Sequence, residues 1–232
     1  LGVILFAIGV LLGMALIGVT IWTDLEASCF DSMMASRGDE PLKTLRCPVL
    51  MTTSETGRIS ATFENTADKP IELRLRAHVT DGFVTLMREV NTTLPLEPGE
   101  KKTAEFQLTA NDRAYRWLIL ARVLQARHHP FPARQAACGV LVLDVPFLTG
   151  NQLFALAIAV ALLCLVGGIA LWSVADWPLN RSALATARTM GILVVCLLIG
   201  FLVAISGAWL IASLLFAINL LLILEVARQT MS

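Results

Sequence analysis

The chain is 232 residues long, is 56% hydrophobic and has a formal net charge of zero. Its mean hydropathy of +0.71 is too high for a soluble globular domain. No basic stripe occurs along the sequence, which argues against a nucleic-acid partner. Most charged residues lie between the first and second apolar segments, which predicts a membrane part and a separate aqueous part.

The first apolar segment, residues 1–22, carries no charge. About 20 residues at ~1.5 Å rise each cross the hydrocarbon core of a bilayer, so we expect a transmembrane helix here. A signal peptide is the competing interpretation, although its apolar region is usually shorter and precedes a cleavage site. Gly9 and Gly13 form a small-xxx-small pair, which predicts close packing against another helix. The alternative is that glycine is simply common in membrane helices.

Residues 23–46 are polar and form a predicted extracytoplasmic connector. A short helix is expected from Glu26 to Ala35, and Gly38 is expected to end it.

Residues 47–147 show the sequence pattern of a β-sandwich. From Ile71 to Thr80 apolar and polar residues alternate strictly, which predicts a strand with one buried face. Asp81-Gly82 and Leu96-Glu97-Pro98-Gly99-Glu100 have turn compositions. Further strands are predicted from Phe83 to Val90 and from Thr103 to Leu108, and the segments Tyr115 to Leu124 and Cys138 to Val145 are predicted as central strands that are apolar on both faces. About seven short strands, with turns every ~8–12 residues, are typical of an immunoglobulin-like antiparallel sandwich. We expect its core around Ile71, Leu73, Leu75, Phe106 and Trp117.

The segment from Gly57 to Thr66, the strand from Ile71 and the turn at Leu96–Glu100 together resemble bacterial extracytoplasmic Ig-like domains of the CARDB type. The resemblance covers residues ~57–124. It implies an Ig-like fold and an extracytoplasmic location, and it implies no activity.

Three more spans are predicted after the sandwich: residues 152–173, 189–205 and 208–225. Asn151 is the expected N-cap of the first, and residues 174–188 are an expected loop. Ser206-Gly207 predicts a tight hairpin between the last two, with one long bent helix as the alternative. The predicted fold class is therefore an α+β membrane protein, in which four transmembrane helices carry one Ig-like sandwich between the first and second.

Arginine placement predicts the orientation. Arg181 and Arg188 in the 174–188 loop, and Arg228 in the tail, lie on one side if there are four spans. The positive-inside rule makes that side cytoplasmic. The protein is then expected in the plasma (inner) membrane, with its sandwich outside or periplasmic.

Cysteine positions fit this orientation. Cys29, Cys47 and Cys138 lie in the predicted outer segment, where disulfides persist. Because the first and last strands of Ig-like sandwiches can run side by side, a Cys47–Cys138 bond is expected, with Cys29–Cys47 as the alternative. Cys164 and Cys196 lie within predicted spans, where packing is the expected role.

The most unusual loop contains His128, His129, Pro130 and Phe131, which we interpret as an exposed contact surface. A zinc site needs three or four ligands, and no further Cys/His pair supplies them nearby. His78 is interpreted as a solvated residue on a polar strand face. No catalytic motif is found, and no enzyme activity or cofactor is expected.

The spans contain no ionisable residue in their apolar cores. Asn219 is the strongly polar side chain within them, and an interhelical hydrogen bond is expected there. We therefore expect a non-catalytic accessory subunit whose partners are membrane lipid and other membrane proteins. The alternative is a free-standing membrane-anchored Ig-like binding or adhesion module, and an enzyme or transporter ranks below both.

Overall fold

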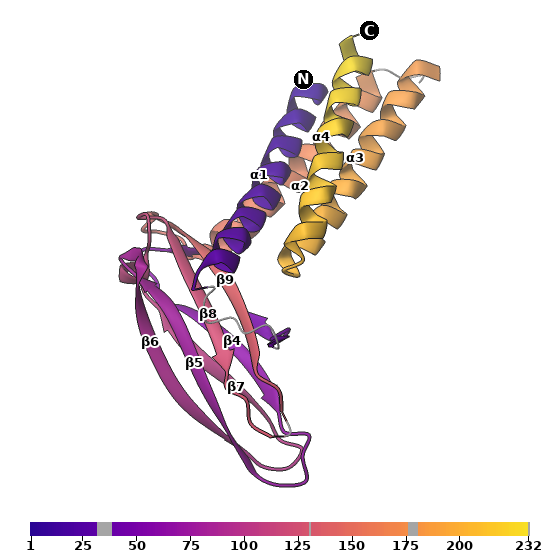
Figure 1. The fold of residues 1–232 in the computed structure, drawn as a ribbon. Coiled ribbons are helices and arrows are strands. Elements are labelled where there is room, and N and C mark those ends of the chain that lie inside the picture. The colour runs from indigo at the N-terminus through magenta and orange to yellow at the C-terminus, as the bar shows by residue number, and fades with distance from the viewer. Residues whose placement is uncertain (32–38, 130, 176–180, 232) are drawn as a thin grey trace. The chain divides into compact units, whose positions relative to one another are not determined.

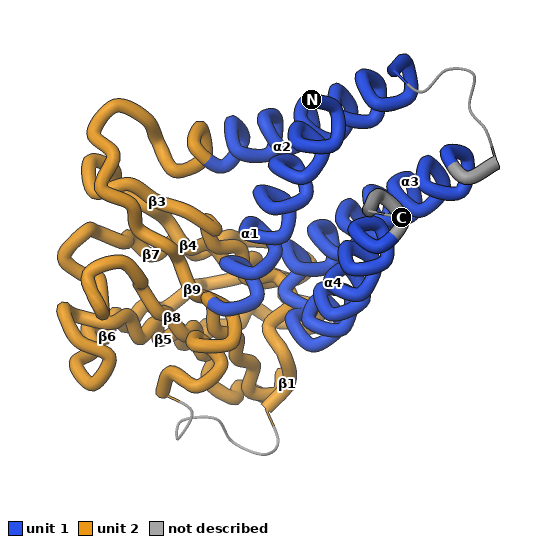
Figure 2. The backbone as a smooth tube through the Cα atoms, turned by 90° about the horizontal axis from the view of Figure 1, so that it is seen from above, with its two compact units in different colours: residues 1–22, 154–232 blue, residues 23–153 orange. Residues whose placement is uncertain are grey.

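The computed structural model describes residues 1–31, 39–129, 131–175 and 181–231. The chain divides into two compact units, Leu1–Trp22 with Phe154–Ser232 and Thr23–Leu153, coloured separately in Figure 2. The first unit is helical and the second is a β-sandwich, so the fold is α+β.

Nine strands are described in the second unit, and they form two sheets (Figure 1). The larger sheet has the order β1-β9-β8-β5-β6, with β3 also paired to β9, and the smaller has the order β2-β4-β7. β1 and β3 run parallel to β9, and the other pairs are antiparallel. The strands are β1 (Glu40–Pro41), β2 (Leu45–Arg46), β3 (Leu50–Thr52), β4 (Gly57–Glu64), β5 (Ile71–Asp81), β6 (Phe83–Leu96), β7 (Lys101–Leu108), β8 (Leu118–Gln125) and β9 (Arg134–Leu143).

The alternating apolar residues of β4, β5 and β7 build the core of this unit. Ile59, Leu73 and Leu75 are at most 2% exposed, and Ile71 and Phe106 join the same cluster. Alternation places these side chains on one face of each strand, and packing of the two sheets buries those faces. The sequence prediction of this core is therefore confirmed for four of its five residues.

Several predicted boundaries need correction. β6 runs for 14 residues from Phe83 to Leu96, further than the expected end at Val90. β8 begins at Leu118 because Tyr115 and Arg116 have φ of 51° and 71°, which end extended backbone in a turn. β9 begins at Arg134, so Cys138 lies inside the strand instead of opening it.

Four helices in the described chain are long and apolar enough to cross a membrane: α1 (Gly2–Cys29), α2 (Gly150–Ala175), α3 (Arg181–Ile205) and α4 (Trp209–Met231). α1 continues unbroken to Cys29, so a separate helix starting at Glu26 is wrong, and residues 32–38 of the connector lie outside the described residues. Thr149 caps α2 in place of Asn151, since its hydroxyl accepts from the Gln152 N–H and the Gln152 side chain accepts from the Thr149 N–H.

α3 begins at Arg181, within the segment expected to be a loop. Alanines at 183, 185 and 187 favour helix over this stretch, so Arg188 is helical and the predicted loop is shorter than expected. Residues 176–180 lie outside the described chain. α3 and α4 are separated by a turn in which Gly207 has φ of 78°, and they lie side by side, as a hairpin requires (Figure 1). One continuous bent helix is therefore excluded.

Candidate functional site

The outer face of the larger sheet, which points away from the core, carries the main polar cluster of the second unit. Arg74, Arg76 and His78 alternate along β5 on this face, and Arg122 of β8 lies directly opposite His78 in the strand register. The first two side chains are exposed, whereas His78 is 3% and Arg122 is 5% exposed. One part of this face is therefore covered and another is open.

Arg122 binds the C-terminal end of α1. Its Nε donates to the Phe30 carbonyl at 2.9 Å, its Nη2 to the Ser28 carbonyl at 3.1 Å, and its Nη1 to Gln135 Oε1 at 2.8 Å. The last carbonyls of a helix have no intrahelical partner and carry partial negative charge, so a guanidinium is well suited to them. Burial lowers the pKa of Arg122, and the nearby Asp31 carboxylate opposes this shift.

His78 is bound by Asp31, which follows the end of α1. His78 Nδ1 and Asp31 Oδ2 are 2.5 Å apart, and their side chains are 4% and 9% exposed. His78 Nε2 lies 3.9 Å from the Glu89 carboxylate of β6. The interpretation of His78 as a solvated residue is therefore wrong, because the chain after α1 covers the polar face of β5 at this position.

An apolar cluster adjoins these polar residues. Ala27 and Phe30 pack on Leu118 and Leu120 of β8, with Val84, Ala137 and Trp117 at the margin. Trp117 therefore belongs to this second cluster and not to the core between the sheets, which corrects the fifth predicted core residue. It precedes the first residue of β8, so the strand alternation does not apply to it. A side chain at Gly139 would overlap the Thr23 carbonyl, so glycine permits the close approach of α1.

The open part of the outer face forms a groove of about 650 Å³ between the ends of β5, β6 and β8. Its charged lining residues are Asp39, Arg74, Arg76 and Arg134. Arg76 pairs with Glu89 at 3.0 Å and Arg134 pairs with Glu40 at 3.3 Å, whereas no ion pair of Arg74 occurs among the described residues. The groove offers guanidinium, amide and hydroxyl groups for hydrogen bonding to a polar segment, and its described lining residues include no nucleophile–base pair.

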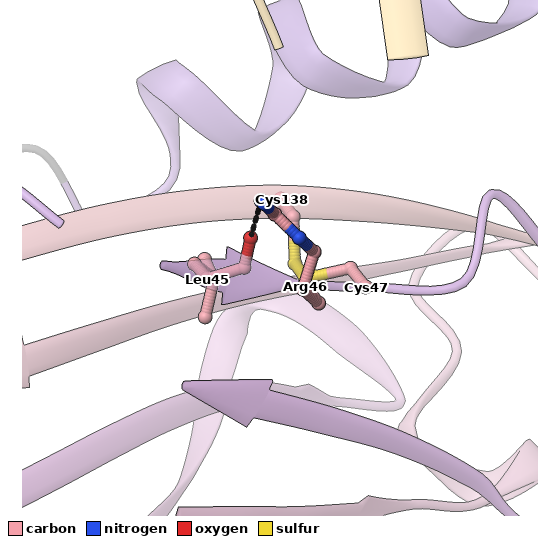
Figure 3. The surroundings of a disulfide bond; sticks show 4 residues. All are labelled: Leu45, Arg46, Cys47 and Cys138. Carbon is pink, nitrogen blue, oxygen red and sulfur yellow. Dashed lines mark hydrogen bonds between the residues drawn. A yellow bond between two sulfur atoms is a disulfide. The ribbon is translucent and has the colours of Figure 1, made fainter. Parts of the chain in front are cut away.

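The disulfide joins Cys47 to Cys138 across 91 residues, with the two Cα atoms 6.5 Å apart (Figure 3). This is the pairing expected from strand adjacency, because β3 follows Cys47 closely and runs parallel to β9, which contains Cys138. Arg46 lies beside the bond and donates to the Leu45 carbonyl at 3.1 Å. Cys29 is a free, exposed thiol, so the alternative Cys29–Cys47 pairing is not observed.

The histidine loop is a tight turn anchored by its aromatic residue. The His128 and Phe131 backbones bond to each other, and Phe131 is 7% exposed within the core cluster. Phe131 is therefore a core residue and not part of a contact surface, whereas His128 and His129 are exposed and Pro130 lies outside the described residues. Over the residues described, no group of three or more His, Cys, Asp and Glu side chains is arranged to hold a metal ion.

In the first unit, the predicted packing glycines contact helices of the same chain. A Cβ at Gly9 would lie 2.8 Å from the Leu165 N of α2, whereas a Cβ at Gly13 would meet only Leu197 side-chain atoms at 3.8 Å and beyond. Asn219 is fully buried, and its Nδ2 donates to the Leu215 carbonyl of the same helix at 2.9 Å. The expected interhelical bond is therefore replaced by an intrahelical one, and Asn219 Oδ1 has no hydrogen-bond partner among the described residues.

Two charged residues were missed as site residues at the level of sequence: Arg122, which is buried on the outer face, and Asp31, which is partly buried after α1. The available signal was an arginine inside a strand predicted to be apolar on both faces, since a charge at such a position needs a partner.

No family model matches the chain, and no curated protein matches it. Solved structures that resemble it include the CARDB domain of a Pyrococcus furiosus protein in complex with di-metal ions, at 13% identity and a TM-score of 0.32, covering 43% of this chain and 90% of that one. A Listeria innocua β-glucosidase in complex with glucose shares 19% identity over 42% of this chain, with a TM-score of 0.30. A Bacteroides uniformis β-glucuronidase shares 15% identity over 42% of this chain, with a TM-score of 0.32. The chain spans 15% of the glucosidase and 12% of the glucuronidase.

Proposed function

We propose that this protein is a non-catalytic accessory subunit of a larger membrane-protein complex. One helix is sufficient to anchor a domain, whereas this chain has four helices of spanning length. The observation that carries the proposal is how little of them the chain buries itself: 17% of the apolar window of α2 and 17% of that of α4. The remaining surface is available to lipid and to partner helices.

The exposed apolar side chains of α3 form a continuous stripe. Ile192, Val195, Ile199 and Leu202 are 47–68% exposed and follow one another at spacings of three and four residues. This spacing places them on one helix face. On α4, Leu214 and Leu221 are 64% and 67% exposed and are also aligned on one face. These two stripes are the proposed contact surfaces for partner helices.

The second unit is assigned here as an Ig-like sandwich of the CARDB type on the outer side of the plasma (inner) membrane. The two-sheet arrangement, with the short strands β1 and β3 parallel to the last strand β9, supports the Ig-like assignment. The disulfide supports an oxidising compartment. Arg188 near the start of α3 and Arg228 near the end of α4 support a cytoplasmic location for these two helix ends, because the positive-inside rule favours arginine on that side.

An impermeant thiol reagent tests this orientation in intact cells. In a background without the free cysteines, Lys101→Cys should label and Arg181→Cys should label only after the membrane is opened. The reverse pattern would overturn the orientation while leaving the four spans in place.

A photo-crosslinking experiment in native membranes tests the subunit proposal. A photoreactive side chain at Leu202 or Leu221 should give a single protein adduct of defined mass, and the complex should survive purification in mild detergent. The same probe is also placed at Val166, which is 66% exposed on α2. Lipid adducts alone at all three positions, together with a monomer in detergent, would refute the subunit proposal.

The second candidate function is a membrane-anchored binding or adhesion module. The groove lined by Arg74, Arg76 and Arg134 favours it, because it is an open concave surface with hydrogen-bonding groups on a rigid sheet. A lone monomer whose outer domain retains a soluble protein ligand, and loses it in Arg74→Glu, would favour this function over the first.

A further inference from the structure

Within the described residues 39–153 of the second unit, the exposed apolar side chains are gathered at one end of the sandwich. Of the described residues 39–153, all the large apolar side chains that are clearly exposed lie there: Phe83 (68%), Leu86 (54%), Met87 (43%), Tyr115 (55%) and Phe147 (91%). We name these five residues the apolar rim. The opposite end of the sandwich, where the 65–70, 97–100 and 126–133 turns lie, has no such side chain among its described residues.

Strand direction places the rim at a single end. β5 ends at Asp81 and β6 starts at Phe83, while β8 starts at Leu118 and β9 ends at Leu143. Because β5 is antiparallel to both β6 and β8, and β8 to β9, these four strand ends are adjacent. Phe83, Leu86 and Met87 follow the first turn, Tyr115 precedes β8, and Phe147 follows β9.

Both chain connections leave the sandwich at this same end. Ala27 and Phe30, near the end of α1, pack on Leu118 and Leu120 at the start of β8. At the start of α2, the Gly150 N–H donates to Glu55 Oε1 at 2.7 Å, and Glu55 lies in the turn after β3. The residues of this unit that connect to α1 and α2 therefore lie at the same end as the apolar rim.

Basic residues lie next to the aromatic residues of the apolar rim. Tyr115 stacks on Trp117 with ring centroids 6.2 Å apart, and Arg113 and Arg116 belong to the same turn. Acidic residues at this end include Glu55, Asp81, Asp112 and Asp144. Asp144 accepts a hydrogen bond from Thr53 at 2.8 Å, and Asp112 pairs with Arg88 at 3.0 Å. Tyr115 and Arg116 both have positive φ, which is an uncommon backbone conformation for residues other than glycine. The Tyr115 ring, in this same turn, is exposed.

Water is a poor environment for these side chains, because apolar surface costs about 25 cal/mol per Å² to leave exposed. The boundary between lipid headgroups and acyl chains accepts aromatic rings together with the charged ends of arginines. We propose that the apolar rim is a lipid-contacting surface which inserts into the headgroup region of a phospholipid bilayer. This inference rests on the proposed membrane insertion of the helices.

Depth-dependent quenching tests the proposal with the full chain in nanodiscs of phosphatidylcholine and phosphatidylglycerol. Single-cysteine variants are prepared in a background that retains the Cys47–Cys138 bond and replaces the three free cysteines. A polarity-sensitive fluorophore is attached at Phe147→Cys on the rim, at Asp68→Cys at the far end of the sandwich, or at Leu163→Cys in α2. Lipids carrying a nitroxide at the headgroup or deep in the acyl chain serve as quenchers.

We expect the headgroup quencher to reduce the Phe147 label at least about twofold more than the Asp68 label, since interfacial side chains lie ~5–10 Å into the boundary region. The deep quencher should reduce the Leu163 label. Equal responses at Phe147 and Asp68, with strong quenching at Leu163, would overturn the rim proposal and leave the membrane proposal intact. Absence of quenching at Leu163 would overturn the membrane proposal itself.

A second measurement moves the label to another position, so that the effect of the two phenylalanines is tested without replacing either of them by the label. The fluorophore is placed at Arg116→Cys, with Phe83 and Phe147 either intact or both replaced by serine. Both phenylalanines are highly exposed, so their replacement should leave the fold unchanged. Quenching of this label by the headgroup nitroxide should fall in the double-serine variant. An unchanged response would contradict the role of the apolar rim in lipid contact.

Discussion

Replacing Arg122 by methionine should weaken the attachment of the end of α1 to the sheet. Methionine keeps most of the apolar stem and removes the guanidinium, which is held by three hydrogen bonds of 2.8–3.1 Å. The Ser28 and Phe30 carbonyls and Gln135 Oε1 then lose their donor. Each buried group left unpaired costs about 1–3 kcal/mol, and two of the three bonds are only partly buried. The expected loss is about 3 kcal/mol.

Thermal unfolding of the full chain in nanodiscs measures this loss. For a unit of this size, 1 kcal/mol corresponds to roughly 3–4 °C, so the unfolding midpoint of the sandwich should fall by about 10 °C. Hydrogen exchange should rise in residues 23–29, because their docking contacts are weakened. Arg122→Lys should recover only part of the loss, since an ammonium lacks the planar fork that reaches three acceptors.

Arg74→Met is the matched control. It makes the same substitution on the same face of the same sheet, at an exposed residue with no ion pair among those described. Its effect should stay within about 0.5 kcal/mol. Equal midpoints for the Arg122 and Arg74 variants would refute the reasoning that the buried guanidinium holds the end of α1.

Cys138→Ser should lower the free energy of unfolding of the sandwich by about 4 kcal/mol, because the lost bond with Cys47 closes a loop of about 90 residues, and chemical denaturation with and without reductant measures this. Gly9→Leu should destabilise the helical unit by at least ~1–3 kcal/mol in a detergent-unfolding titration, since its Cβ meets the α2 backbone, whereas Gly191→Leu, with no atom within 4 Å of its Cβ, should be neutral; equal effects would contradict the packing argument. The N–H of Glu97 and the Lys102 ammonium lower the pKa of the Glu100 carboxyl. The ionised Glu100 therefore stabilises the fold at pH values above the ordinary carboxyl pKa, and this stabilisation is lost as the pH falls through the lowered pKa. The midpoint difference between the native chain and Glu100→Gln should accordingly be constant near neutral pH and vanish in acid, and a difference that persists in acid would contradict the assignment.

The local features of this protein were accessible from its sequence because they depend on neighbouring residues alone. Side chains alternate along a strand with period 2, so Ile71, Leu73 and Leu75 indicated one buried face whatever the strand packs against. The glycines of turns act within a few residues, as Gly99 and Gly207 do at positive φ. Four long uncharged segments likewise indicated helices of spanning length from composition alone.

Which residues on the polar face of β5 are buried could not be predicted in this way. His78 and Arg74 occupy equivalent alternate positions in the same strand, yet one is buried and the other exposed. The difference arises because the end of α1 and Asp31, more than 40 residues earlier in the chain, cover only one part of the sheet. Local periodicity carries no information about such a contact.

Contacts between distant segments decided the remaining features. Gly9 was recognised as a close-packing residue, but its partner is α2 of the same chain, which only the folded bundle identifies. Phe131 was assigned to an exposed loop, and the tertiary structure places its ring in the core. The residue type indicated close packing at Gly9 but not at Phe131. In both cases the arrangement of helices and sheets in space determined which surface the residue packs against.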